Sequence, residues 1–146
     1  MIDIQHLMFD TIASGVATSR PDVCVTDVFD EGTASFPCIT VEQKNNIPYR
    51  RMNTAASAEN YATITFQVTA YSDKQDTAKS ECLTLLNLVD GIIQEKGFRR
   101  TYLSEAFNIS RTIFRRYARY EAIVRQPYVV DPDTANEKTV YEVYRR

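Results

Sequence analysis

Residues 61–71, YATITFQVTAY, alternate almost without exception between apolar and polar side chains. The apolar positions of this stretch are Ala62, Ile64, Phe66, Val68 and Ala70. A period of two with many β-branched residues is typical of a strand that is buried on one face only. The stretch therefore predicts a sheet that packs one face on a hydrophobic core and leaves the other face to water or to another subunit.

A helix and two further strands are predicted directly after this strand. Residues 76–96 carry apolar side chains at three- and four-residue steps, which is the helical period, and Gly97 suits the left-handed position that ends a helix. Residues 98–107 and 112–124 have strand patterns, and the short link between them suits an antiparallel hairpin. Charged or aromatic side chains prevail at the odd positions of the last strand, which are Ile113, Arg115, Tyr117, Arg119 and Glu121.

The first 60 residues predict one helix and two strands. Residues 3–19 have an apolar stripe at helical spacing, Asp3 can accept hydrogen bonds from the first turn, and Pro21 ends the helix. Residues 22–29 and 36–43 read as strands that could pair as a hairpin. Residues 44–60 have no clear period and predict a long loop. That loop contains side chains of the kind enriched at protein interfaces, namely Tyr49, Arg50, Arg51 and Met52.

These elements predict a single α+β domain in residues 1–125. We expect a mostly antiparallel sheet with two helices packed on one face, in the order α-β-β-β-α-β-β. Residues 126–146 form a C-terminal extension with a polar linker, and residues 139–144, TVYEVY, have the pattern of an extra short strand. Such a strand could add to its own sheet or to that of a neighbouring subunit.

Composition and motifs exclude several classes of protein. A net charge of −2 argues against a dedicated nucleic-acid binder, and no apolar run approaches the length of a membrane span. The N-terminus does not resemble a signal peptide, so we expect synthesis in the cytoplasm. The odd count of three cysteines indicates buried reduced thiols, and a single histidine, His6, gives no metal-ligand spacing. We find no catalytic or phosphate-binding motif, and expect no enzyme activity, cofactor or metal.

A run of arginines in the last part of the domain allows two interpretations. The run comprises Arg111, Arg115, Arg116, Arg119 and Arg125, and tyrosines alternate with some of them. Arginine and tyrosine on one strand could contact a nucleic acid by charge and by stacking on bases. The acidic remainder of the chain favours the other interpretation, in which the strand faces water or pairs with acidic groups of another subunit.

The chain resembles phage tail terminator proteins, also called tail completion or head–tail joining proteins. The resemblance rests on the alternating strand at 61–72, the helix that ends in LVDGIIQEKGFRR (88–100) and the late strand IFRRYARYEAIV (113–124). The N-terminal helix fits as well, so the resemblance covers about the first 125 residues. It depends on pattern and element order and not on a chemical motif, and it does not extend past Gln126.

The resemblance implies a virion protein of the tail or neck that forms a homo-oligomeric ring, typically a hexamer. Such a ring would cap the head-proximal end of the tail tube, stop its polymerisation and bind the tail tube protein and a neck or head-completion protein. DNA would pass through the ring without specific binding. The alternatives are another neck component (a head-side stopper or connector), a tail tube subunit or, in a different class, a small nucleic-acid-binding protein.

Two groups of residues are expected to make the contacts of such a ring. We assign axial or subunit contacts to Tyr49, Arg50, Arg51 and Met52, because they lie together in the long polar loop. We assign the contact between ring neighbours to Arg115, Tyr117 and Arg119, because they lie on the strand face that the predicted core does not need. A cyclic ring requires two different patches on each subunit.

Overall fold

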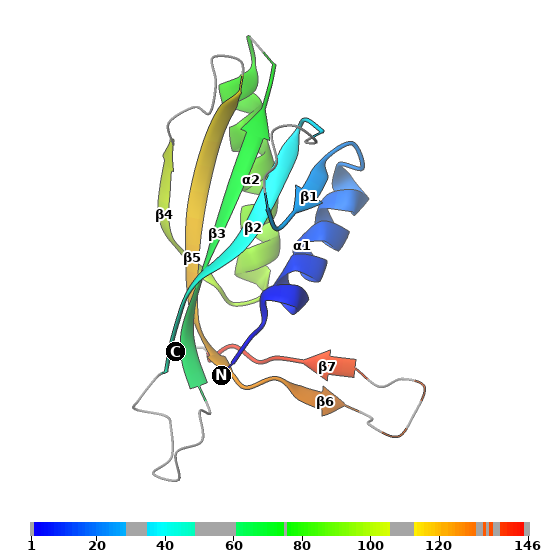
Figure 1. The fold of residues 1–146 in the computed structure, drawn as a ribbon, viewed down its shortest axis with the longest axis vertical. Helices are drawn as coiled ribbons and strands as arrows, with labels where there is room; N and C mark the ends of the chain where they lie inside the picture. The colour runs from blue at the N-terminus through cyan, green and yellow to red at the C-terminus, as the bar shows by residue number, and fades with distance from the viewer. Residues whose placement is uncertain are drawn as a thin grey trace.

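The computed structural model describes residues 2–28, 35–48, 61–74, 76–105, 113–130, 133, 135 and 138–144. Two helices and seven strands follow one another in this part of the chain (Figure 1). Their bounds are α1 Gln5–Ser19, β1 Cys24–Thr26, β2 Cys38–Pro48, β3 Tyr61–Ser72, α2 Ala78–Glu95, β4 Arg99–Glu105, β5 Phe114–Arg125, β6 Tyr128–Val130 and β7 Lys138–Val140.

Five of the strands form one sheet in the spatial order β1-β2-β3-β5-β4. The pairs β2–β3, β3–β5 and β4–β5 are antiparallel, which confirms the predicted α+β fold and the hairpin of the last two strands. The prediction that the first two strands pair as a hairpin was wrong, because β1 and β2 are parallel. Eleven residues separate β1 from β2. A connection of this length can bring the chain back to the end at which β1 begins, so no tight turn forces the two strands to be antiparallel.

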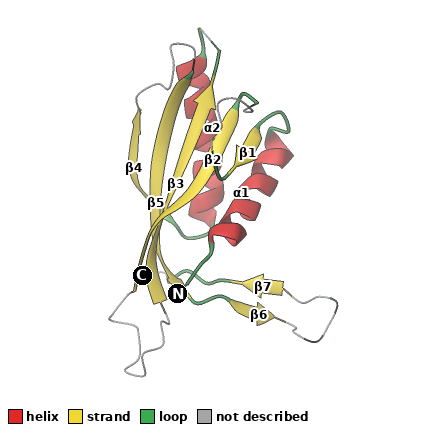
Figure 2. Ribbon diagram, in the orientation of Figure 1, coloured by secondary structure: helices red, strands yellow, loops and turns green. Residues whose placement is uncertain are grey.

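Both helices pack on the face of the sheet that carries the apolar alternation of β3. The main core contains Met8, Ile12 and Val16 of α1, together with the buried apolar residues of α2 and the alternating residues of β3. Gly15 lets the two helices approach closely, since a Cβ atom there would lie 2.5 Å from Cδ1 of Ile92. The Figure 2 view shows the helices together at one side of the curved sheet.

Several strands in the structure begin or end at residues other than those predicted. Residues 44–48 are not loop, because β2 continues to Pro48 alongside the twelve-residue strand β3. The register of β2 against β3 shifts between Gln43 and Asn45, and this irregularity hides the continuation in the sequence pattern. Of the strand predicted at 22–29, the described residues form only Cys24–Thr26 at the sheet edge, and Phe29 lies outside the described residues. Residues 49–60, with Tyr49, Arg50, Arg51 and Met52, lie outside the described residues.

The C-terminal segment returns to its own sheet. β6 and β7 form an antiparallel pair that extends away from the body in Figure 1. Beyond β7, Val143 pairs with Val124 of β5, while the Arg125 amide donates to the Glu142 carbonyl at 2.9 Å. The amide of Tyr144 donates to the carbonyl of Ile123 at 2.8 Å. The strand β7 itself pairs with β6 and not with the five-stranded sheet, and it is the residues after β7 that contact β5.

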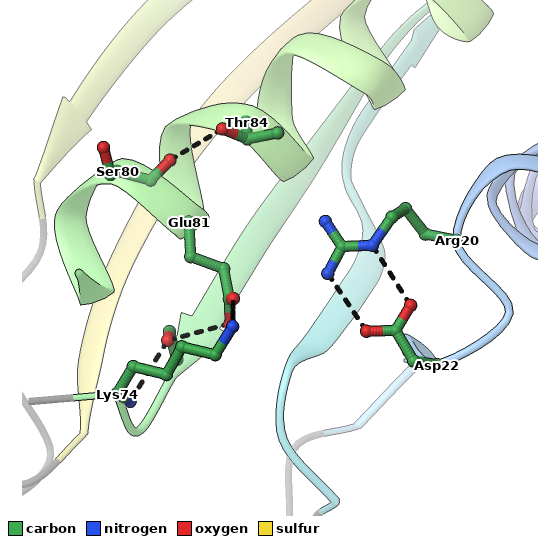
Figure 3. A network of polar contacts seen from close by, with 7 residues as sticks. Arg20, Asp22, Lys74, Ser80, Glu81 and Thr84 are labelled. Carbon is green, nitrogen blue, oxygen red and sulfur yellow. Dashed lines mark hydrogen bonds and ion pairs between the residues drawn. The ribbon is translucent and has the colours of Figure 1, made fainter.

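A polar network joins the end of β3 to the start of α2 (Figure 3). The Glu81 carboxylate is buried, accepts a hydrogen bond from the Ser72 hydroxyl at 3.0 Å and forms an ion pair with Lys74. Nearby, Arg20 donates from Nε and Nη2 to the two carboxylate oxygens of Asp22, at 3.1 and 3.0 Å. The hydrogen bond from Arg20 lowers the pKa of Asp22 below its ordinary value. The contacts of Glu81 join the first turn of α2 to the end of β3, whereas the Arg20–Asp22 pair is a local contact just after α1.

Two glycines near the end of α2 provide a matched pair for a stability test. Gly97 has a φ of 94°, which is unfavourable for residues with a Cβ atom, whereas a Cβ at Gly91 would meet nothing within 4 Å. We expect Gly97→Ala to lower the free energy of unfolding by about 1–2 kcal/mol. Gly91→Ala should raise it by about 0.5–1 kcal/mol, because alanine favours a helix interior. Urea unfolding of the two variants measures both values, and equal signs would contradict the assigned conformations.

The buried thiol of Cys82 predicts a loss of stability at alkaline pH. Burial, followed by the nearby charge of Glu81, raises the pKa of Cys82 from 9.0 to about 12. Between these values the unfolded chain has lost this proton while the folded chain keeps it, so stability present below pH 9 falls as the pH rises. This group contributes a slope of up to about 1.4 kcal/mol per pH unit. Urea unfolding at pH 8–11 should show a shallower decline for Cys82→Ala than for the wild-type chain.

Candidate functional site

The face of the sheet opposite the helices presents ordered rows of polar side chains. Register aligns Glu42, Gln67, Arg119 and Tyr102 in one row across β2, β3, β5 and β4. The adjacent row contains Thr40, Thr69, Tyr117 and Ser104. Because side chains alternate between the two faces of a strand, these rows lie on the face that no helix of the described chain covers. We refer to it as the open face.

A hollow of about 350 Å³ lies on the open face, and we call it the polar trough. Its lining residues come from β2, β3 and β5, and they are Glu42, Lys44, Gln67, Thr69, Tyr71, Arg115, Tyr117 and Arg119. Three of them are basic and one is acidic, so the trough is positively charged although the whole chain has a net charge of −2. This local balance suits a partner that brings carboxylates or other anionic groups.

The centre of the trough is held in place by contacts between its own side chains. Nε of Arg119 donates to Oε1 of Gln67 at 3.0 Å, and its guanidinium carbon lies 5.7 Å from the ring centroid of Tyr117. The ring of Tyr117 in turn packs against that of Tyr102, with 5.7 Å between centroids. A hydrogen bond and a cation–π contact both restrict the Arg119 side chain, so its charge is presented at a defined position.

Two further contacts order the margins of the trough. Nζ of Lys44 lies 2.6 Å from Oε2 of Glu42, which partly neutralises the β2 side. On the β4 side, hydrogen bonds with Ser104 and then Tyr117 lower the pKa of the Tyr102 hydroxyl. Because Glu42 pairs with Lys44, the net positive charge of the trough comes from Arg115 and Arg119 of β5.

The structure brings together the three residues that the sequence assigned to the ring contact. Arg115, Tyr117 and Arg119 follow one another on the open face, and all three line the trough. Arg116 is different, because its register partner Ala70 belongs to the core face, and its Nε atom is buried with no hydrogen-bond partner among the described residues. The described arginines of the run are therefore divided between the two faces, and Arg111 lies outside the described residues.

Sequence reasoning missed three residues of this surface. Glu42 and Lys44 were divided between a predicted strand and a predicted loop, and the register shift between Gln43 and Asn45 interrupts the alternation that would relate them. Tyr102 lies next to a register shift between Arg100 and Tyr102, which breaks the alternation of β4. Neither the continuation of β2 past its register shift nor the position of Tyr102 had a clear sequence signal.

A second hollow has the opposite charge. It has a volume of about 380 Å³ and is lined by Asp3, Gln5, His6, Phe9, Asp10 and Asp27, which come from the start of α1, the segment just before it and the residue after β1. We call it the acidic hollow. Nε2 of His6 lies 3.2 Å from Oδ2 of Asp10, and both side chains are exposed. The acidic hollow therefore lies near the β1 edge of the sheet, while the polar trough spans its central strands.

Among the described residues, no three histidine, cysteine, aspartate or glutamate side chains are grouped so that they could hold a metal ion. No helix in the described part of the chain has the length and apolar character needed to cross a membrane. Comparison with known proteins adds no assignment, because no protein-family model matches the chain and no curated protein matches it.

Proposed function

We propose that this chain is a structural virion protein that forms a ring at the head-proximal end of a phage tail tube. In this role it would end tube polymerisation and join the tube to the neck. The resemblance of residues 1–125 to tail terminator proteins suggests the role, and the polar trough is the observation that carries it. An ordered, positively charged surface on an uncovered sheet face is well suited to contact between subunits.

The two hollows offer the different patches that a cyclic ring needs. In a heterologous contact, one patch of each subunit meets another patch of the next subunit. Arg115 and Arg119 of one copy would face the carboxylates of the acidic hollow of its neighbour, chiefly Asp10 and Asp27. Opposite charges on the two patches would favour this head-to-tail pairing over contacts between like patches.

The proposal is tested by the assembly state of the purified chain. Light scattering after size-exclusion chromatography should give a closed oligomer with a single mass, and negative-stain images should show rings, alone or at one end of purified tail tubes. At high salt the measured mass should fall from that of the ring towards that of the monomer, because salt screens the proposed contact between charges. A monomer at all concentrations that also fails to bind tail tubes would contradict the proposal.

Particles made without this protein distinguish the proposed role from that of another neck component. If the chain ends tube growth, its absence should give tails longer than normal. Normal-length tails that are not attached to heads would instead assign it to a stopper or connector. A complete lack of tube would indicate a tail tube subunit.

A further inference from the structure

Two of the three cysteines are direct neighbours on adjacent strands. Cys24 of β1 is the register partner of Cys38 of β2, and both belong to a small cluster with Tyr71, Ile113 and Phe36. Neighbouring strands lie about 4.8 Å apart, and a disulfide requires Cα atoms about 4.4–6.8 Å apart. The third cysteine, Cys82, lies separately in the main core.

The two thiols of the pair are in contact but differ in exposure. Cys38 is 1% exposed, whereas Cys24 is half-buried in a three-residue strand at the edge of the sheet. Burial, together with the charge of Cys24 and a hydrogen bond between the two side chains, raises the pKa of Cys38 to about 12. An external reagent therefore reaches Cys24 first, while Cys38 is placed to react with whatever forms on Cys24.

We propose that Cys24 and Cys38 form a redox-modification site, which a low-molecular-weight disulfide such as oxidised glutathione converts to an intramolecular disulfide. The Cys24 thiolate attacks one sulfur of oxidised glutathione, a mixed disulfide forms on Cys24, and one glutathione leaves. The Cys38 thiolate then attacks the Cys24 sulfur and releases the second glutathione. In total the protein loses two thiol hydrogens, and one oxidised glutathione is reduced to two glutathiones.

The bond would fasten the edge strand to the sheet. It closes a loop of 15 residues, counting both cysteines, and it joins β1 directly to β2. The cross-link also lies beside the polar trough, because Tyr71 belongs to the cysteine cluster and lines the trough. Oxidation should therefore stabilise the chain, with a rise in Tm on the order of 5 °C, since closing such a loop restricts the unfolded chain.

The test uses the full native chain with oxidised glutathione over a range from pH 7 to pH 9. Intact mass should fall by two hydrogens, and peptide mapping without reductant should join Cys24 to Cys38. Closure should become faster at higher pH, because more Cys38 is then present as thiolate. Cys38→Ala should retain one glutathione on Cys24, and Cys24→Ala should react much more slowly than the wild-type chain. Cys82→Ala is the matched control and should close as the wild-type chain does.

Three results would overturn this inference. They are a stable glutathione adduct on Cys24 that never closes in the wild-type chain, a native disulfide that includes Cys82, and cross-linking only between chains. The same reaction in concentrated urea shows whether the native fold directs the pairing, because the unfolded chain should form mixed pairs. The experiment does not depend on ring formation, so its outcome and that of the assembly test are separate.

Discussion

Replacement of Phe66 by alanine is expected to lower the free energy of unfolding by about 3–5 kcal/mol. The Phe66 ring is fully buried in the centre of β3 and packs edge-on against Phe98, with 5.6 Å between ring centroids and 71° between planes. Its replacement by alanine removes buried apolar surface and the aromatic contact, and it leaves a cavity at which the surrounding residues lose packing contacts. Urea unfolding followed by circular dichroism measures the effect.

Leu83→Ala is the control for this prediction. Leu83 is also a large apolar residue, but it is 37% exposed on α2. We expect its replacement to change the free energy of unfolding by less than about 0.5 kcal/mol. Equal losses for the two variants would show that the core does not lie between β3 and the helices.

Reversal of charge in the polar trough is expected to abolish the proposed ring. Arg115→Glu with Arg119→Glu would place carboxylates opposite the acidic hollow of the neighbouring copy. Like charges in contact cost several kcal/mol, so we expect the dissociation constant of each contact to rise by about 100-fold or more. Light scattering should then give the monomer mass at concentrations that give a ring for the wild-type chain.

The same experiment has both a folding control and a rescue. Lys79→Glu with Lys96→Glu changes the net charge equally on exposed residues at the two ends of α2, and should leave the ring intact. Adding Asp10→Arg and Asp27→Arg to the trough variant restores opposite charges across the contact and should restore the ring. If the trough variant still forms rings, the trough is not the contact; if only the rescue fails, the acidic hollow is not its partner.

Local patterns predicted most of the fold because each depends on neighbouring residues. The alternation of β3 and the helical spacing of α2 identify both elements and the faces that they bury. Gly97 was expected to end α2, and its positive φ confirms this. The odd positions of β5 were expected on the uncovered face, and the register of β5 with β3 confirms this as well. These features could be predicted from the spacing of hydrophobic residues and from the backbone preference of glycine alone.

Features that involve distant residues could not be predicted in this way. The parallel direction of β1 depends on the path of the chain between the strands, and the extension of β2 depends on hydrogen bonds from β3. The contacts of Tyr102 with Tyr117 and of Cys24 with Cys38 follow from pairing between strands that are separate in the chain. No local signal specifies such pairing, because register is decided by the sheet as a whole.

Hydrophobic periodicity was sufficient to predict an α+β domain with one buried and one open sheet face, since hydrophobic period and burial are directly linked. It also determined which β5 residues the core does not use. That Glu42, Lys44 and Arg119 line one trough follows from the pairing of separate strands and could be seen only in the folded chain. Charge has no period of its own, so a charged surface of this kind exists only when register brings residues of several strands together.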